Sequence, residues 1–503
     1  MIYKSKLADF KKLIRKIEMI DNTRNSLIYW DKITNMPEDR IEYRSKVMAF
    51  MADEQYKMLS GREFSSYVKY FKNNKRNDEI TNAMVRRICS NSGYVNKIPE
   101  LEYKDYVELF TRSEQIWEKA KEEKNFVVLQ PYWERIFGHF RNFAKYWGYE
   151  EDPYDALMGY YDQELTVAKM DEMVEEIKNV LIEYREKIQV STDTEKVCLN
   201  EIPKIDGLCQ QKIWEMILSE IGFSFTAGRV DIGAHPTMLS NSPYDVRIVN
   251  SYNEKDLRTG IFNVLHSGGK GIYKQSINKE LLGTFLADAP SWVLEEAVGR
   301  FYENIIGRSK GFWMYFHEKI CSIAPEMKKY TACEMFRSVN SVEANTSRLE
   351  ADELSYLLHI IIRYELEREI VGGRMEVKDL PEAWNQKYEE YLGVRPKDDG
   401  EGVLQDIHWS AGYVGYFPTY FVANIAAAQI ADAIERRCGK LDELVAEGRF
   451  DVINGWLKEN IFRHGAVYTT AEIIEKSTGD VLDSSHYIDY LRNKFSEVYK
   501  LNL

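Results

Sequence analysis

The sequence predicts a mainly α-helical protein with one small β-sheet. Helical periodicity dominates, because apolar residues recur three and four positions apart among charged residues over long stretches. Only 12 prolines interrupt 503 residues, and we find no internal repeat or low-complexity linker that would separate domains. We therefore predict one domain over residues 1–503, with two helical halves around a deep cleft, the usual place for a binding site in a chain of this size.

Four segments carry the helical pattern most clearly: residues 1–23, 41–60, 101–124 and 168–190. Within the last of them, the stretch from Met170 to Ile188 has acidic residues early and basic residues late, as the helix dipole favours. The strand signal is weak and local. Residues 245–252 (DVRIVNSY) alternate and are rich in β-branched side chains, which predicts a short sheet near residues 230–255.

Charge and hydropathy exclude several partners. The formal net charge of -13 argues against nucleic acid, because phosphate binding needs a basic surface. No run of 18 apolar residues is present, so we expect no membrane span. The first 20 residues alternate charged and apolar side chains, unlike a signal peptide, and we expect a cytoplasmic protein. The six cysteines are scattered without a Cys-x-x-Cys pair, which predicts buried thiols instead of disulfides or a thiolate metal site.

The eight histidines fall into two groups. Four lie in ordinary helical contexts and read as structural residues: His139, His317, His359 and His486. Four lie in unusual local sequences: His235, His266, His408 and His464.

The segment around His266 resembles a metal-binding helix motif that keeps only the first of its three functional residues. A zinc-peptidase helix carries His-Glu-x-x-His, in which the two histidines share a face and hold the metal while the glutamate takes a proton from the bound water. Here the five positions are His266, Ser267, Gly268, Gly269 and Lys270. A hydroxyl replaces the general base, and an ammonium group with no free lone pair replaces the second imidazole.

Several ordered motifs surround this segment. They are His235-Pro236, Asp245-x-Arg247, LADAPSWVLEEAVGRFYEN from Leu286 to Asn304, SVEANTSRLEADE from Ser341 to Glu353, DLPEAWNQKYEEYLGV from Asp379 to Val394, GVLQDIHWS from Gly402 to Ser410, GYFPTY from Gly415 to Tyr420 and RHG from Arg463 to Gly465. Through them the chain resembles the carboxypeptidase Taq (thermostable carboxypeptidase 1) family of zinc metallopeptidases over nearly its whole length.

The resemblance implies a zincin-like metallocarboxypeptidase architecture and a homodimer. It matches His266 to the first zinc ligand of the family and Glu296 to the third. It matches Ser267 to the catalytic glutamate and Lys270 to the second histidine ligand. It further implies that Arg348, His408 and Tyr420, with His235 nearby, bind the carboxylate of a peptide or small-molecule ligand or polarise its carbonyl group. In the Asp245-x-Arg247 element, Val249 stands where the family has Thr.

A charge argument accounts for the altered motif. Without a metal ion, a buried Glu296 would be an unpaired charge, at a cost of several kcal/mol. We hypothesise that Lys270 pairs with Glu296 or Glu295 in place of the ion. Adjacent helical residues point about 100° apart, so Glu295 and Glu296 do not converge on one metal. We therefore expect no zinc cofactor and a vestigial site at His266 and Glu296.

The sequence leaves two classes of function open. The first is a pseudo-peptidase, or a very weak peptidase, that retains a binding cleft for peptide C-termini. The second is an enzyme: a residual broad-specificity carboxypeptidase, or a protein repurposed to another reaction in the same cleft. A Ser267–Lys270 nucleophile pair, a Schiff-base Lys270 and a carboxylate pair of the glycosidase kind are conceivable but have no supporting motif.

Overall fold

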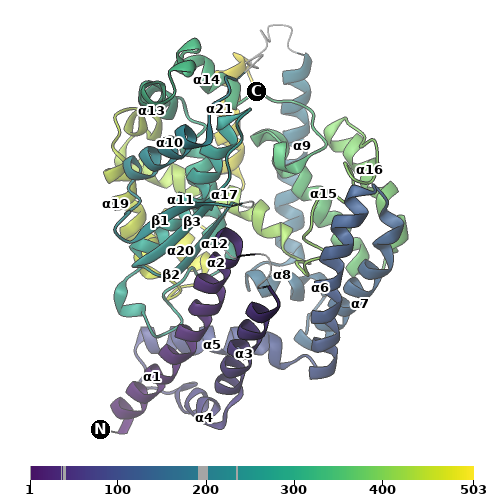
Figure 1. Cartoon of the computed structure of the whole chain (residues 1–503), viewed down its shortest axis with the longest axis vertical. Helices are drawn as coiled ribbons and strands as arrows, with labels where there is room; N and C mark the ends of the chain where they lie inside the picture. The colour runs from purple at the N-terminus through teal and green to yellow at the C-terminus, as the bar shows by residue number, and fades with distance from the viewer. Residues whose placement is uncertain (1, 36, 38–40, 191–201, 234–235) are drawn as a thin grey trace. The chain divides into compact units, whose positions relative to one another are not determined.

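The computed structural model describes residues 2–35, 37, 41–190, 202–233 and 236–503. It is mainly helical with one three-stranded sheet, as the sequence predicts (Figure 1). The chain forms two compact units, each of three segments. The first unit contains residues 1–92, 199–339 and 426–482, and the second contains residues 93–198, 340–425 and 483–503. The predicted cleft stays a prediction.

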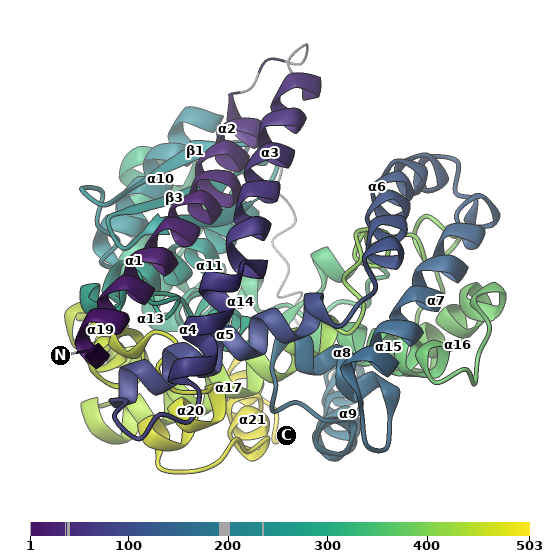
Figure 2. The ribbon, with the colours of Figure 1, turned by 90° about the horizontal axis from the view of Figure 1, so that it is seen from below.

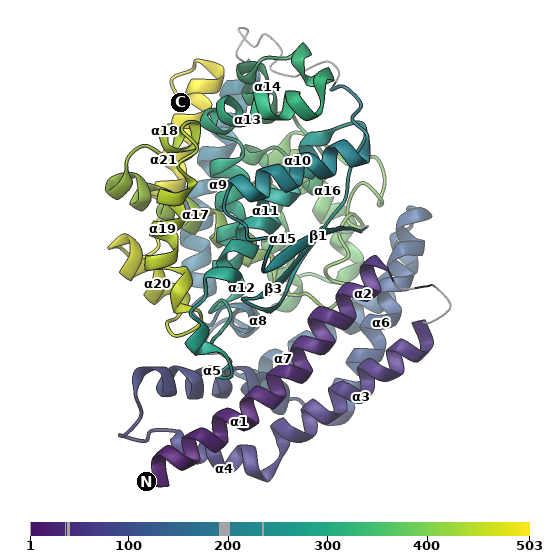
Figure 3. The same ribbon diagram turned by 60° about the vertical axis from the view of Figure 1, so that its left-hand side comes forward.

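The first unit contains most of the helices and the sheet. Its helices are α1 (Ile2–Asn22), α2 (Tyr29–Thr34), α3 (Ile41–Ser60), α4 (Arg62–Phe71), α5 (Glu79–Asn96, which continues into the second unit), α10 (Gly207–Glu220), α11 (Leu257–Ser276), α12 (Trp292–Arg300), α13 (Lys310–Ile323), α14 (Ala332–Val339), α18 (Leu441–Ala446), α19 (Phe450–Asn460) and α20 (Thr470–Thr478). Two π-helical turns, η1 (Thr23–Ile28) and η5 (Phe301–Ile306), extend α1 and α12. Helices α1 and α3 run side by side (Figure 3).

The sheet has the strand order β1-β3-β2, with β1 (Gly228–Ile232), β2 (Thr237–Ser242) and β3 (Asp245–Asn250). Strand β3 is parallel to β1 and antiparallel to β2. Val246, Ile248 and Val249 of the central strand are buried, and α11 packs against β3 and β2. The sheet therefore supports the helix that carries His266.

Asp256 is the N-cap of helix α11, and its side chain accepts a hydrogen bond from the backbone N–H of Arg258. The Gly-Gly-Lys-Gly stretch of α11 lets neighbouring elements approach the helix closely. A Cβ atom on Gly268 would lie 2.4 Å from Leu218, and one on Gly269 would lie 2.4 Å from the ring of Tyr302. The glycines cost helix propensity, but they allow α10 and η5 to pack directly on the α11 backbone.

The second unit is helical. It contains α6 (Glu100–Glu122), α7 (Gln130–Trp147), α8 (Pro153–Tyr161), α9 (Val167–Val190), α15 (Glu353–Val371), α16 (Leu380–Leu392) and α21 (Ser485–Tyr499), while α17 (Phe417–Cys438) begins in it and ends in the first unit. Helices α6 and α7 pack side by side, as do α15 and α16 (Figure 2). Helix α15 is the core of this unit, since every residue from Glu353 to Tyr364 is buried.

Short 3₁₀ turns connect these helices. They are η3 (Phe126–Val128), η4 (Lys279–Leu281), η6 (Pro325–Lys329), η7 (Arg348–Glu350), η8 (Val377–Asp379) and η9 (Phe462–His464). The turn η7 matters for the site, because it carries the buried Arg348.

The predicted elements agree with the structure to within two residues. The four predicted helices correspond to α1, α3, α6 and α9, and the predicted strand from residue 245 is β3. The prediction that the cysteines are buried was wrong. Of the five free thiols in the described residues only Cys321 is buried, while Cys333 is exposed. None of the described helices is long and apolar enough to cross a membrane.

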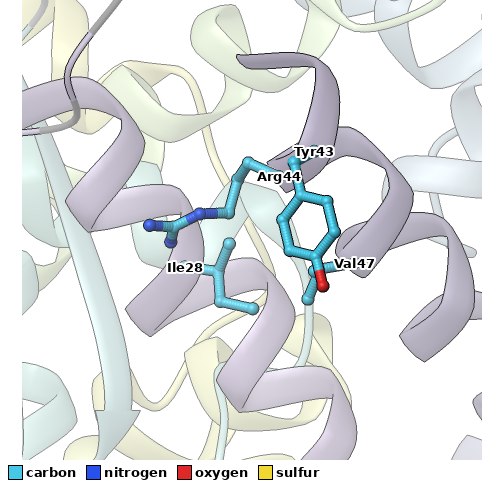
Figure 4. A pocket seen from close by; sticks show the side chains of 4 residues that line it. All are labelled: Ile28, Tyr43, Arg44 and Val47. Carbon is cyan, nitrogen blue, oxygen red and sulfur yellow. The ribbon is translucent and has the colours of Figure 1, made fainter. Parts of the chain in front are cut away.

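A pocket lies between η1 and α3, lined by Ile28, Tyr43, Arg44 and Val47 (Figure 4). The guanidinium group of Arg44 lies 2.6 Å from Asp31 Oδ2. The pocket shares no residue with the candidate sites described below, and its position was not predicted from the sequence.

Candidate functional site

Helix α11 presents a row of three basic side chains toward α12 and η5. His266, Lys270 and Lys274 are spaced four residues apart, so they lie one above another on a single helix face. The facing elements supply a carboxylate for each: Glu303 for His266, Glu296 for Lys270 and Glu295 for Lys274. We call these six residues, together with Arg300, the α11–α12 cluster.

Lys270 and Glu296 form the centre of this cluster. Lys270 Nζ lies 2.6 Å from Glu296 Oε2 and donates a hydrogen bond to it. The other oxygen, Oε1, accepts a hydrogen bond from Arg300 Nε at 3.2 Å. Glu296 is 4% exposed, so two cations compensate a carboxylate that has almost no access to water. The structure thus places Lys270 at Glu296, one of the two partners hypothesised from the sequence.

His266 is oriented by two carboxylates. Its Nδ1 lies 2.9 Å from Glu303 Oε2, and its Nε2 faces Glu296 Oε2 at 3.4 Å. The imidazole ring lies on Gly299, where an added Cβ would be 2.6 Å from Cε1. A carboxylate on one ring nitrogen is the arrangement that fixes the tautomer and direction of metal-ligating histidines in general. The π-turn η5 places Glu303 beside the histidine.

The acidity of the two glutamates reflects these cations. Burial raises the pKa of Glu296, but Lys270, His266 and Arg300 outweigh it and hold the pKa well below its ordinary value. Burial likewise raises the pKa of Glu303, whereas the Arg300 guanidinium and the hydrogen bond from His266 lower it to a net value of about 2. Both groups are therefore carboxylates at neutral pH.

Lys274 extends the row into a second ion pair. Its Nζ lies 2.6 Å from Glu295 Oε2 and also contacts Asp288. Burial lowers the pKa of Lys274, but the two carboxylates raise it to a net value above the ordinary one. Glu295 and Glu296 consequently point to different lysines, in agreement with the expected angle between neighbours on a helix.

A catalytic zinc needs three protein ligands and an open position for water. The α11–α12 cluster offers His266 Nε2 and Glu296, and the ammonium of Lys270 occupies one oxygen of that glutamate. Among the residues that the structure describes, no three His, Cys, Asp or Glu side chains are grouped so as to hold a metal ion. This donor set does not fit a catalytic zinc.

In the second unit, Arg348 and Arg363 share one carboxylate. Arg348 donates from Nε and Nη2 to Asp406 Oδ1 at 3.0 and 2.7 Å, and Arg363 Nε donates to Asp406 Oδ2 at 2.7 Å. Arg363 is fully buried and also binds the backbone oxygen of His359, whereas Arg348 is 7% exposed. Two guanidinium groups against one carboxylate leave an excess positive charge, and Arg348, at 7% exposure, is the less deeply buried of the two.

His408 lies beside these charges as a neutral imidazole. Burial, together with the arginines, lowers its pKa to about 4 although Asp406 opposes the shift. Its ring stacks on Tyr416 and lies 6.2 Å from the ring of Tyr420, which in turn lies 5.8 Å from the guanidinium carbon of Arg348. The structure therefore brings Arg348, His408 and Tyr420 together. His235 lies outside the described residues.

Six residues of these sites were not predicted from the sequence: Lys274, Asp288, Arg300, Glu303, Arg363 and Asp406. Glu303 and Arg300 follow Glu296 at positions i+7 and i+4, a helical spacing that would have identified their shared face. Asp406 lies two residues before His408 in the quoted motif. Arg363 has no local signal, because its role depends on the packing of α15.

Comparison with solved structures identifies the fold. A structure of Pyrococcus furiosus carboxypeptidase matches with a TM-score of 0.95 at 30% identity, over 97% of this chain and 99% of that chain. A carboxypeptidase structure from Deinococcus radiodurans matches with a TM-score of 0.94 at 28% identity, over 99% of this chain and 100% of that chain. The fold is that of a metallocarboxypeptidase-like protein.

The family follows from the sequence matches. Residues 9–495 match the model of the carboxypeptidase Taq (M32) metallopeptidases. Carboxypeptidase 1 of Bacillus subtilis is 36% identical over 481 residues, 95% of each chain. A thermostable carboxypeptidase 1 of Pyrococcus furiosus is 31% identical over 93% of this chain and 94% of its own length. The chain belongs to the carboxypeptidase Taq family.

Proposed function

We propose that this chain binds the C-terminal carboxylate of peptides and has little or no peptidase activity. The observation that carries the loss of peptidase activity is the contact of 2.6 Å between Lys270 Nζ and Glu296 Oε2, at the positions matched to a histidine ligand and a glutamate ligand of the family. An ammonium at this point fills the electrostatic role of a metal ion without its Lewis acidity.

The charge balance in the first unit supports the proposed lack of peptidase activity. Lys270 and Arg300 neutralise the charges of Glu296 and Glu303. The imidazole of His266 contacts both carboxylates. A dication added here would leave excess positive charge in a buried place. The general base is absent as well, because Ser267 is an alcohol, and removal of such a base costs about 10²–10⁴-fold in rate.

The charge excess in the second unit supports ligand binding. A carboxylate that reached Arg348 would compensate the net positive charge of the Arg348–Asp406–Arg363 group, and guanidinium groups bind carboxylates through paired hydrogen bonds. The neutral His408 adds a donor or acceptor for a neighbouring amide without a second full charge.

The contact between Lys270 and Glu296 argues against a Ser267–Lys270 nucleophile pair. A lysine that acts as a base needs a free amine lone pair, whereas Lys270 Nζ donates a hydrogen bond to Glu296 Oε2. We therefore favour the binding function over a repurposed hydrolase.

The binding proposal is tested by calorimetry with acetyl-Ala-Ala-Ala as the free acid and as the amide. We expect the acid to bind and the amide to bind at least about tenfold more weakly, because a charge-assisted pair is lost. Arg348→Lys should remove most of this preference. Arg374→Lys is the matched control, because Arg374 is an exposed arginine paired with Glu369 in the same unit. Equal affinity of acid and amide would refute carboxylate recognition.

The catalytic part is tested by metal content and peptide hydrolysis. Protein purified without added metal should contain far less than one zinc per chain, and zinc supplementation should not produce release of C-terminal residues. The double change Ser267→Glu with Lys270→His should raise both zinc content and release. Stoichiometric zinc together with rapid release by the unchanged protein would refute the proposal.

A further inference from the structure

A row of aromatic rings leads away from Arg348 in the second unit. The ring of Tyr420 lies 5.0 Å from that of Tyr416, and Tyr416 lies 5.6 Å from Tyr413. A branch runs from Tyr416 through the buried Tyr161 to Tyr160, with 5.1 Å between the centroids at each step. We call Tyr420, Tyr416, Tyr413 and Tyr160 the tyrosine row.

The row becomes more exposed with distance from Arg348. Tyr420 and Tyr416 are half-buried, whereas Tyr413 is 41% exposed and Tyr160 is 47% exposed. Single exposed tyrosines are common on protein surfaces, but Tyr420, Tyr416 and Tyr413 are in direct ring contact, and Tyr160 is joined to them through the buried Tyr161. Tyrosine offers a large flat contact area at a small entropic cost, which is why it is frequent in binding surfaces.

The row is held in place by the elements beneath it. The hydroxyl of Tyr106 on α6 donates a hydrogen bond of 3.3 Å to the backbone oxygen of Gly412, next to Tyr413. An added Cβ on Gly412 would lie 2.1 Å from this hydroxyl, so the loop and α6 are in close contact. The side chains of the row are phenols, so the guanidinium group of Arg348 is followed by an aromatic surface.

The spacing of the rings suits an extended peptide. An extended chain advances about 3.5 Å per residue. The guanidinium carbon of Arg348 is 5.8 Å from the Tyr420 ring, and Tyr416 is one step of 5.0 Å further. A chain that placed its terminal carboxylate at Arg348 and ran along the rings would bring the side chain of its next-to-last residue near Tyr416 and Tyr413.

We propose that the tyrosine row is a binding subsite for the next-to-last side chain of the bound peptide, and that it selects aromatic side chains there. The inference rests on the proposed function, because Arg348 fixes the position of the C-terminus. It goes beyond that function by naming the class of peptide: one with Phe, Tyr or Trp before its last residue.

The experiment compares two peptides with the same C-terminal residue, acetyl-Ala-Phe-Ala and acetyl-Ala-Ala-Ala, each as the free acid and as the amide. Calorimetry should show that the Phe acid binds about five- to tenfold more tightly than the Ala acid, the gain expected for one or two aromatic contacts. Tyr413→Ala should reduce the preference at least threefold, and Tyr413→Phe should retain it because the ring makes the contact.

Tyr149→Ala is the matched control, since Tyr149 is also 41% exposed, lies in the same unit and is not part of the row. It should leave both affinities unchanged. If the two acids bind equally well and both exceed their amides, the subsite is refuted while carboxylate recognition stands. If no peptide binds, the proposed function fails and the subsite with it. If Tyr149→Ala and Tyr413→Ala weaken binding alike, the effect is not specific to the row and the proposal is overturned.

Discussion

Glu303 in the first unit and Glu367 in the second are both enclosed carboxyl groups, but they have different neighbours. Glu303 lies between His266 and Arg300, and its pKa is about 2. Glu367, on α15, is fully buried and accepts hydrogen bonds from the side chains of Tyr154 and Trp409 and from the backbone N–H of Gly415. Burial raises the pKa of Glu367 to about 7, although these donors and the more distant Arg363 oppose the shift.

The difference shows what a cation contributes at a buried carboxyl group. Neutral donors satisfy the oxygens of Glu367 but supply no full charge, so burial dominates its acidity. For Glu303 and Glu296, the cations in contact reverse the direction of the pKa shift, from upward to downward. The same reasoning explains why Lys270 matters: it keeps Glu296 charged where the family resemblance implies a metal ion. Glu367 instead has a structural role: it accepts hydrogen bonds from Trp409 and Gly415, which lie at the two ends of the loop after His408.

The largest expected effect comes from Lys270→Met. Removal of one partner of a buried ion pair leaves a charge without compensation and typically costs about 3–5 kcal/mol. Because Arg300 still contacts Glu296, we expect a loss of about 3 kcal/mol in the free energy of unfolding, measured by urea denaturation. Lys187→Met, which removes an exposed pair on α9, should change stability little. An equally small change for Lys270→Met would contradict the charge argument.

The second prediction concerns the pH dependence that Glu367 creates. Its pKa in the folded protein, about 7, lies above the ordinary value of 4.5, so its contribution to stability is complete below about pH 4.5 and is lost as the pH rises through 7. The loss amounts to about 3 kcal/mol, at about 1.4 kcal/mol per pKa unit.

In urea denaturation, Glu367→Gln should abolish the decrease in the free energy of unfolding between pH 5 and 8. This holds whatever the stability of the variant at any single pH. The amide group of glutamine also faces donors, so we expect the variant to be less stable than the unchanged protein at pH 5. A slope that persists in the variant would show that another group titrates.

Glu303 should give a slope of the opposite sign. Its pKa of about 2 lies below the ordinary 4.5, so its contribution is complete above about pH 4.5 and is lost as the pH falls through 2. The loss is about 3 kcal/mol by the same conversion. Glu303→Gln should therefore be less stable than the unchanged protein at pH 7, and the difference should shrink on acidification. A constant difference from pH 7 to pH 3 would rule out this coupling.

The smallest expected effect tests the packing that holds His266 in place. A methyl group in Gly299→Ala would lie 2.6–2.8 Å from three atoms of the imidazole ring, so the ring or α12 must move. Overpacking of this kind costs about 1–3 kcal/mol. Gly455→Ala is the control, because Gly455 lies in α19 with open space around it and should be neutral or slightly stabilising. Similar thermal midpoints for the two variants would show that the site adapts freely.

The sequence by itself determined much of the fold and the centre of one site. Helical periodicity gave α1, α3, α6 and α9, and β-branched alternation gave β3, because these patterns depend on which side chains face the core. The four-residue spacing of His266 and Lys270 places both on one face of a helix wherever the helix packs. Glu296 was found through the family resemblance.

Only the tertiary structure decided which charges meet. Lys270 contacts Glu296 instead of Glu295, Lys274 takes Glu295, and Arg348 shares Asp406 with Arg363. Partners that lie 21 to 58 residues apart are not fixed by local patterns, because their distances depend on how whole helices pack. The acidity of Glu303 and Glu367 depends on the same packing, since burial and the nearest cations set the sign of each shift.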